Sequence, residues 1–188
     1  MVGDRKRRSN LVLIGKVVYM RVIGIDPGTN VTGFAIVEKG RSGGMEYIGG
    51  GEVKLARGAP LSERLLEISE CLNSVIAEYG PTHCAIEEVF FAKNVKSALT
   101  LGHGRGVALL SAAKAGIDVY EYSASTIKQA VVGSGRGTKD QVQKMVRILL
   151  KLQRPLGADA SDAIAVAICH LNHYNPRLAR AGGLAARV

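Results

Sequence analysis

The sequence has no tryptophan, few cysteines and fewer acidic than basic residues. Its three cysteines, Cys71, Cys84 and Cys169, lie far apart and form no C-x-x-C pair, which argues against a disulfide framework and a zinc ribbon. His170 and His173 have a spacing seen in metal sites, but two ordinary histidines near a helix end account for them better. We therefore expect a reducing, cytoplasmic location.

The sequence also lacks a long apolar run. The apolar residues that follow the basic segment 5–8 are interrupted by Lys16 and Arg21, and no A-x-A cleavage site comes after them. A membrane-spanning helix needs about 20 predominantly apolar residues. We expect neither export nor a membrane span. Residues 1–19 are instead predicted to be a disordered basic extension, and Met20 is a possible alternative start.

Positive charge is abundant and uneven. The chain carries 25 Lys and Arg against 16 Asp and Glu, a formal net charge of +9. Residues 92–156 hold 11 basic and 3 acidic side chains, whereas residues 1–91 carry no net charge. This concentration favours a binding face for a polyanion such as nucleic acid, although a solvated basic surface would look the same in sequence.

The 188 residues are enough for one globular domain. Apolar periodicity and turn residues predict an α/β fold in which antiparallel strands form one edge of the sheet. We expect the domain to span residues 20–174 and a flexible tail to span 175–188. The predicted strands are 20–26, 31–37, 45–55, 84–89 and 117–122, and the predicted helices are 61–79, 95–115, 125–132, 139–152 and 158–170.

Four acidic residues occupy informative positions. Asp26 and Glu87 each end an apolar strand, and Asp159 and Asp162 open the last predicted helix on one face, at i and i+3. Buried carboxylates are costly unless they are protonated, paired or metal-bound. If the four converge, their oxygen atoms would suit Mg²⁺ or Mn²⁺, the cations that support phosphodiester hydrolysis.

Each acid also has a simpler interpretation. Asp26 precedes Pro27-Gly28 and could shape a turn, and Glu87 beside Glu88 could mark an exposed strand end. Asp159 could be a helix N-cap, and Asp162 could be an acid favoured by the helix dipole. The acids alone therefore leave a metal site and four local roles open.

Four segments together resemble the RuvC family of Holliday-junction resolvases: residues 21–37 with "GIDPGT", 85–109 with "AIEEVFF", 127–152 with "GSGRGTKDQ", and 158–170 with "ADASDA". They occur in the family's order. The resemblance implies a ribonuclease-H-like fold, with a mixed five-stranded sheet flanked by helices. It implies an endonuclease that resolves four-way DNA junctions by paired symmetric cuts in recombination and repair.

The resemblance also implies partners and cofactors. It implies a homodimer whose interface uses the helix 95–115, and cooperation with the RuvA–RuvB branch-migration complex. Two Mg²⁺ ions per subunit are implied, with Mn²⁺ as a substitute. We expect no membrane partner and no small-molecule cofactor.

By the same resemblance, Asp26, Glu87, Asp159 and Asp162 match the family's catalytic and metal-binding acids. Some members have His in place of Asp159. Glu88 stands where the family often has Gln, which adds a negative charge beside the site.

Aromatic and basic residues near these acids are candidate DNA contacts. Phe90 matches the family position that stacks on junction bases, and Lys128 and Lys139 match lysines close to the active site. Core aromatics and ordinary surface lysines are the simpler interpretations. Further candidate DNA-binding residues are Phe91, Lys93, Lys96, Arg136, Lys144, Arg147, Lys151 and Arg154.

Three other functions compete with this one. Actin-like ATPases and sugar kinases also place D-x-G-T between strands, but their two lobes need a longer chain. A non-catalytic junction-binding protein would keep the basic stretch without needing strand-end acids. An RNA-processing nuclease of the same fold would share the acids but not the Phe90 and Lys128 segments.

Overall fold

The computed structural model describes residues 12–14, 17–28, 30–40, 42–56, 58–88 and 95–175. Six strands and five helices follow one another in these ranges. They are β1 (Val12–Ile14), β2 (Val17–Asp26), β3 (Val31–Lys39), β4 (Met45–Lys54), α1 (Leu61–Tyr79), β5 (His83–Glu87), α2 (Val95–Lys114), β6 (Asp118–Tyr122), α3 (Ala124–Val132), α4 (Lys139–Leu149) and α5 (Ala158–His173).

The strands form one mixed sheet in the order β4-β3-β2-β5-β6. β2, β3 and β4 pair antiparallel, whereas β2, β5 and β6 run parallel. This arrangement confirms the five-stranded mixed sheet. β1 adds a short antiparallel pairing to the beginning of β2, which starts at Val17 rather than at the predicted Met20. Part of the segment that was expected to be an extension therefore belongs to strands.

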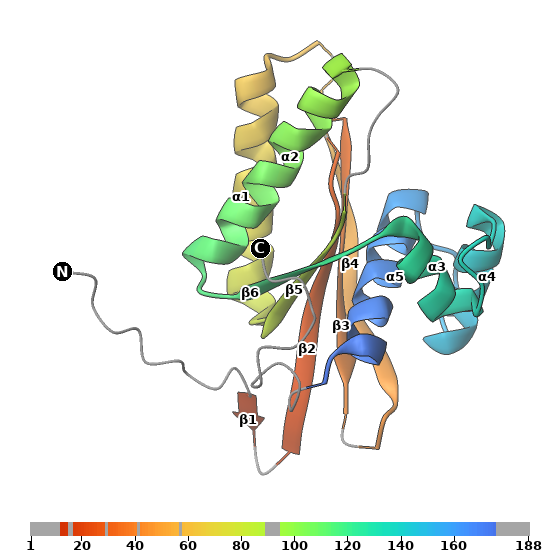
Figure 1. The fold of residues 1–188 in the computed structure, drawn as a ribbon. Coiled ribbons are helices and arrows are strands. Elements are labelled where there is room, and N and C mark those ends of the chain that lie inside the picture. The colour runs from red at the N-terminus through yellow and green to blue at the C-terminus, as the bar shows by residue number, and fades with distance from the viewer. Residues whose placement is uncertain are drawn as a thin grey trace.

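Helices cover both faces of the sheet, with α1 and α2 on one side and α3, α4 and α5 on the other (Figure 1). Alternation along the central strands supplies both cores, because successive side chains point to opposite faces. Val22, Ala35 and Ala85 pack into the core beneath α5, while Ile23 and Ile36 pack into the core beneath α1 and α2. Burial on both faces explains why the central strands read as continuous apolar runs.

α5 lies close against the sheet because two strand residues are glycines. A Cβ on Gly24 would overlap the carbonyl oxygen of Ala163 and lie 2.9 Å from the amide nitrogen of Ala167. A Cβ on Gly33 would overlap the carbonyl oxygen of Asp159. These two glycines therefore allow the first turns of α5 to rest on the backbone of β2 and β3.

The helix ends follow local sequence signals. α1 covers the predicted 61–79 and stops at Gly80, which adopts the left-handed conformation with φ 56°. α4 begins at Thr138, which forms a reciprocal capping box with Gln141. It ends at Leu149, three residues earlier than predicted, and Lys151 just beyond it has a positive φ of 52°. α5 continues past the predicted end at His170 to His173.

His170 and His173 have structural partners that support the simpler interpretation. His170 is buried, its Nδ1 lies 2.8 Å from the hydroxyl of Tyr122, and burial lowers its pKa to about 3. Its ring also lies 4.6 Å from that of Tyr120. Nδ1 of His173 lies 2.9 Å from the carbonyl oxygen of Cys169. Within the described ranges, no helix combines the length and the apolarity needed to cross a membrane.

Candidate active site

The carboxyl ends of β2 and β5 bring the first two predicted acids to one edge of the sheet. The two strands are parallel, and Ile25 lies opposite Ile86. Asp26 and Glu87, the next residues of each strand, therefore leave the sheet side by side at the same edge. The turn after Asp26 is held by Thr32, whose hydroxyl donates to the carbonyl oxygen of Gly28.

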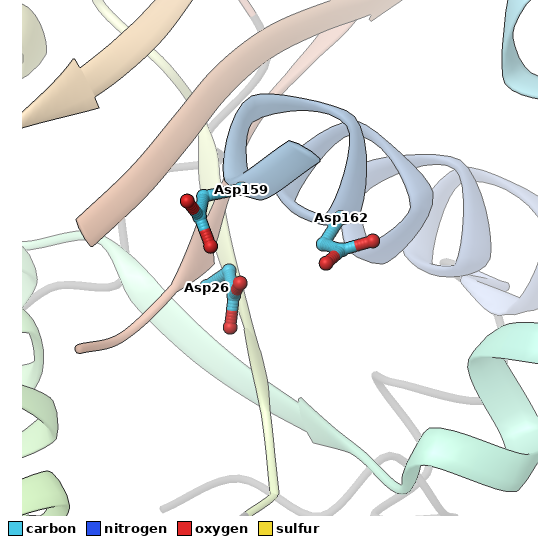
Figure 2. A group of neighbouring side chains, drawn as sticks. All are labelled: Asp26, Asp159 and Asp162. Atoms are coloured by element: carbon cyan, nitrogen blue, oxygen red, sulfur yellow. The ribbon is translucent and has the colours of Figure 1, made fainter. Parts of the chain in front are cut away.

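The first turns of α5 bring the other two acids to this edge. Asp159 and Asp162 are three residues apart and project from one face of the helix (Figure 2). Oxygen atoms of Asp26, Asp159 and Asp162 all lie within 4.8 Å of one another. The N-cap of α5 is Gly157, so Asp159 is not the helix cap that its position also allowed. Three of the four predicted acids therefore form one cluster.

Burial and neighbouring charge disfavour ionisation of Asp26. The pKa of Asp26 rises from 3.8 to about 7, chiefly because the carboxyl is desolvated, and then because Asp162, Glu87 and Asp159 repel its negative charge. Lys139 acts in the opposite direction. A cation bound at this site would stabilise the ionised form of the Asp26 carboxyl.

Glu87 lies beside the cluster rather than within the three-residue group. Burial and then the charge of Asp162 raise its pKa, while Lys128 and Lys139 act to lower it. Asp162 and Lys139 therefore act on the pKa of Glu87 as they do on that of Asp26. Its neighbour Glu88 is exposed, and the Glu88 backbone N–H donates to the carbonyl oxygen of Tyr122 at 2.9 Å. Glu88 follows the last residue of β5.

Two lysines bring positive charge to these acids. Nζ of Lys139 lies 2.6 Å from Oδ2 of Asp162, and this hydrogen bond is the main reason that the lysine pKa is raised. Lys139 is the first residue of α4, directly after its N-cap. Lys128, on α3, is partly buried and close enough to Glu87 to affect its pKa. Both lysines therefore lie close to the acids.

The donor set fits a hard divalent cation. Three carboxylates supply only oxygen ligands, which Mg²⁺ and Mn²⁺ prefer. These carboxylates repel one another, and this repulsion adds to the effect of burial in raising the pKa of Asp26. A bound cation would neutralise their negative charge. Among the described residues, Asp26, Asp159 and Asp162 are the group of Asp, Glu, His or Cys side chains whose ligand atoms lie close enough together to hold a metal ion.

The structure describes the side chains of only some of the other predicted DNA-binding residues. Arg136, Lys144, Arg147, Lys151 and Arg154 are exposed in and around α4. Phe90, Phe91 and Lys93 fall outside the described residues, and Lys96 lies in the first turn of α2 where only the backbone is described. The DNA-contact predictions for all of these side chains therefore remain predictions.

Sequence reasoning missed Glu52, a residue of β4 that reaches the same edge. It lies opposite Gly33 in the sheet, and a Cβ on Gly157 would overlap its Oε1. A carboxylate is favourable at this position because the N-terminus of α5 carries a partial positive charge. An acid inside a glycine-rich strand gives no periodic signal, so only the packing of α5 reveals it.

Known proteins resemble this chain closely. Residues 22–170 match the family described as "Crossover junction endodeoxyribonuclease RuvC". The proteins of that name from Trichlorobacter lovleyi and Syntrophotalea carbinolica are 50% and 49% identical to it, over 85% and 83% of this chain and 89% and 96% of theirs.

Solved structures of RuvC and of a related resolvase also resemble this chain. The Thermus thermophilus RuvC in complex with a Holliday junction substrate has a TM-score of 0.79 and 33% identity, over 90% of this chain and 99% of that one. A yeast mitochondrial Holliday junction resolvase shares the fold, with a TM-score of 0.60 at 13% identity over 81% of this chain and 78% of its own. With this sheet, this acidic cluster and these relatives, the chain belongs to the RuvC family of crossover junction endodeoxyribonucleases.

Proposed function

We propose that this protein is an endonuclease that resolves four-way DNA junctions by paired phosphodiester cuts during recombination and repair. The observation that carries the proposal is the convergence of Asp26, Asp159 and Asp162, with Lys139 paired to Asp162, in a chain of the RuvC family. An ATPase of the actin type does not explain this cluster. A protein that only binds junctions would have no need of it.

The four acids would hold two Mg²⁺ ions, or Mn²⁺ in their place. When bound, these cations activate a water molecule for attack on phosphorus and stabilise the leaving oxygen. Asp26 and Glu87 bind from the strand ends, and Asp159 and Asp162 bind from α5. Because β2, β5 and α5 are packed elements, the ligands are held in position before DNA arrives.

Lys139 and Lys128 supply positive charge beside the acids. Lys139 is hydrogen-bonded to Asp162 and extends into solvent, so its ammonium can also contact a phosphate oxygen of the bound strand. Negative charge accumulates on the phosphate in the transition state, and a fixed cation there stabilises it. Lys128 adds positive charge on the Glu87 side of the site.

DNA binding would extend from this site along the basic surface of α3 and α4. Arg136, Lys144, Arg147 and Lys151 are the candidate phosphate contacts, together with Lys93, Lys96 and Arg154, and Phe90 and Phe91 are the candidate stacking residues. Paired cuts require two active sites, so we propose a homodimer that acts on junction DNA in the cytoplasm with the RuvA–RuvB complex.

The test compares cleavage of a four-way junction with cleavage of duplex DNA, single-stranded DNA and RNA, in Mg²⁺. We expect symmetric cuts in the junction alone. Asp26→Asn, Glu87→Gln and Asp159→Asn should abolish cutting and retain junction binding measured in Ca²⁺, because each removes a metal ligand and not a phosphate contact. Near-wild-type cutting by any of these three variants would refute the metal site, and cutting of RNA would favour an RNA-processing nuclease.

A further inference from the structure

A hollow of about 480 Å³ opens at the same edge of the sheet as the acids. It lies where β3 begins and β4 ends. Its volume is in the range of pockets that hold small organic groups. The lining residues are Asn30, Val31, Lys54, Leu55 and Gly58.

Strand register places this hollow next to the acids. Asp26 pairs with Gly33 of β3, and Val31, two residues closer to the strand's beginning, pairs with Lys54 of β4. Two strand residues span about 7 Å, so the hollow lies close to the acids. A DNA strand whose scissile phosphate sits at the acids, and which runs from there towards β4, would pass over this hollow.

The chemistry of the lining suits a nucleotide. Oδ1 of Asn30 accepts a hydrogen bond of 3.0 Å from Nη1 of Arg64, so the amide NH₂ is the end that can donate to a ligand. Lys54 is 76% exposed, and its ammonium lies 3.6 Å from Oε2 of Glu52. Val31 and Leu55 add apolar surface. The hollow thus combines an amide donor, a cation and apolar walls.

We propose that this hollow is a subsite for one nucleotide of the cleaved strand, adjacent to the scissile phosphate. The base rests against Val31 and Leu55, the Asn30 amide donates to an acceptor on the base, and Lys54 contacts a phosphate. The inference deepens the proposed function and rests on it. The subsite lies outside the basic stretch 92–156 that the sequence analysis singled out, because every residue that lines the subsite precedes residue 92.

The experiment measures single-turnover junction cleavage in Mg²⁺ for the wild type, Asn30→Ala and Lys54→Ala. The junctions carry either all bases or one abasic position within three nucleotides of the cut. The matched control is Asn73→Ala, which replaces an exposed residue of the same type on α1. Loss of one hydrogen bond should slow Asn30→Ala by about tenfold on the intact junction. Asn73→Ala should cleave at the wild-type rate.

The abasic junctions make the test specific. One abasic position should slow the wild type, and the same position should cause a smaller further loss in Asn30→Ala, because the amide contact is already missing and only the packing of the base on Val31 and Leu55 remains to be lost. Additive losses at every position, or Asn30→Ala and Lys54→Ala cleaving at the rate of Asn73→Ala, would overturn the subsite while leaving the nuclease intact. A wild type that cuts no junction would overturn both proposals.

Asn30→Asp separates a ligand contact from a structural one. This variant keeps an oxygen acceptor for Arg64 but has no NH₂ donor. If Asn30 only anchors Arg64, the Asp variant should recover the wild-type rate, and the inference fails. If Asn30 donates to the DNA, the Asp variant should remain at least as slow as Asn30→Ala.

Discussion

Replacing Asp26 with Asn should stabilise the metal-free protein while it destroys the metal site. The carboxyl has a pKa of 3.8 in an exposed setting and about 7 in the fold, because it is desolvated and surrounded by Asp162, Glu87 and Asp159. One pKa unit corresponds to 1.36 kcal/mol, so ionised Asp26 costs the fold roughly 4 kcal/mol above pH 7. Asn has nearly the same shape and no charge.

The sign of the pH dependence follows from the raised pKa. The folded protein binds the Asp26 proton more tightly than the unfolded chain does, so this group contributes most to stability below pH 3.8. That contribution is lost as the pH rises towards 7. We therefore expect Asp26→Asn to exceed the wild type by about 2 to 4 kcal/mol at pH 8. Near pH 4.5 the difference should fall to about 1 kcal/mol.

The assay is urea unfolding in a chelator, at several pH values between 4.5 and 8. It is repeated at pH 8 with Mg²⁺, which should stabilise the wild type by mass action and leave Asp26→Asn nearly unchanged. Equal stability of the two proteins at pH 8 in chelator would refute the reasoning. A stability gain of the same size at pH 4.5 and pH 8 would also refute it, because the gain would then not come from ionisation.

Three further predictions concern the site's surroundings. Gly33→Ala should distort the first turn of α5 and lower both stability and cleavage rate. Gly44→Ala, in the turn between β3 and β4, should do neither, because the added methyl would come no closer than 4.0 Å to another side chain. Thermal unfolding and single-turnover kinetics measure the two effects. Lys139→Ala should slow single-turnover cleavage with little loss of binding in Ca²⁺, whereas Lys144→Ala should weaken binding and reduce the salt slope of log affinity by about one. Phe90→Ala should weaken junction cutting far more than it lowers the melting temperature, since lost stacking costs about 1–3 kcal/mol per base. A variant at this position that melts earlier but cuts normally would indicate a core residue.

Local signals in the sequence were sufficient for most elements. Gly80 in the left-handed conformation ends α1 at the predicted residue, and the Thr138–Gln141 capping box starts α4 at the predicted one. Such signals act over one or two helical turns, so they can be read without the fold. They are weaker at the far ends of α4 and α5, where the predicted boundaries missed by three residues.

The sequence by itself determined where the four acids stand on their strands and helix. Asp26 and Glu87 had to stand at strand ends, because apolar runs stop at them, and Asp159 and Asp162 had to share a face, because helical spacing requires it. Whether these pairs meet was decided only by tertiary structure. Parallel pairing of β2 with β5 joins the first two, and the bare backbones of Gly24 and Gly33 let α5 bring in the others.

Long-range packing also decided what no local pattern could show. The contact of Lys139 with Asp162, the place of Glu52 at the N-terminus of α5, and the hollow between β3 and β4 all join segments that are distant in the chain. The periodicity of a segment tells which face is apolar, but not which other segment will cover it. That choice depends on the shape and volume of the assembled core, which exist only once the sheet and its helices have packed together.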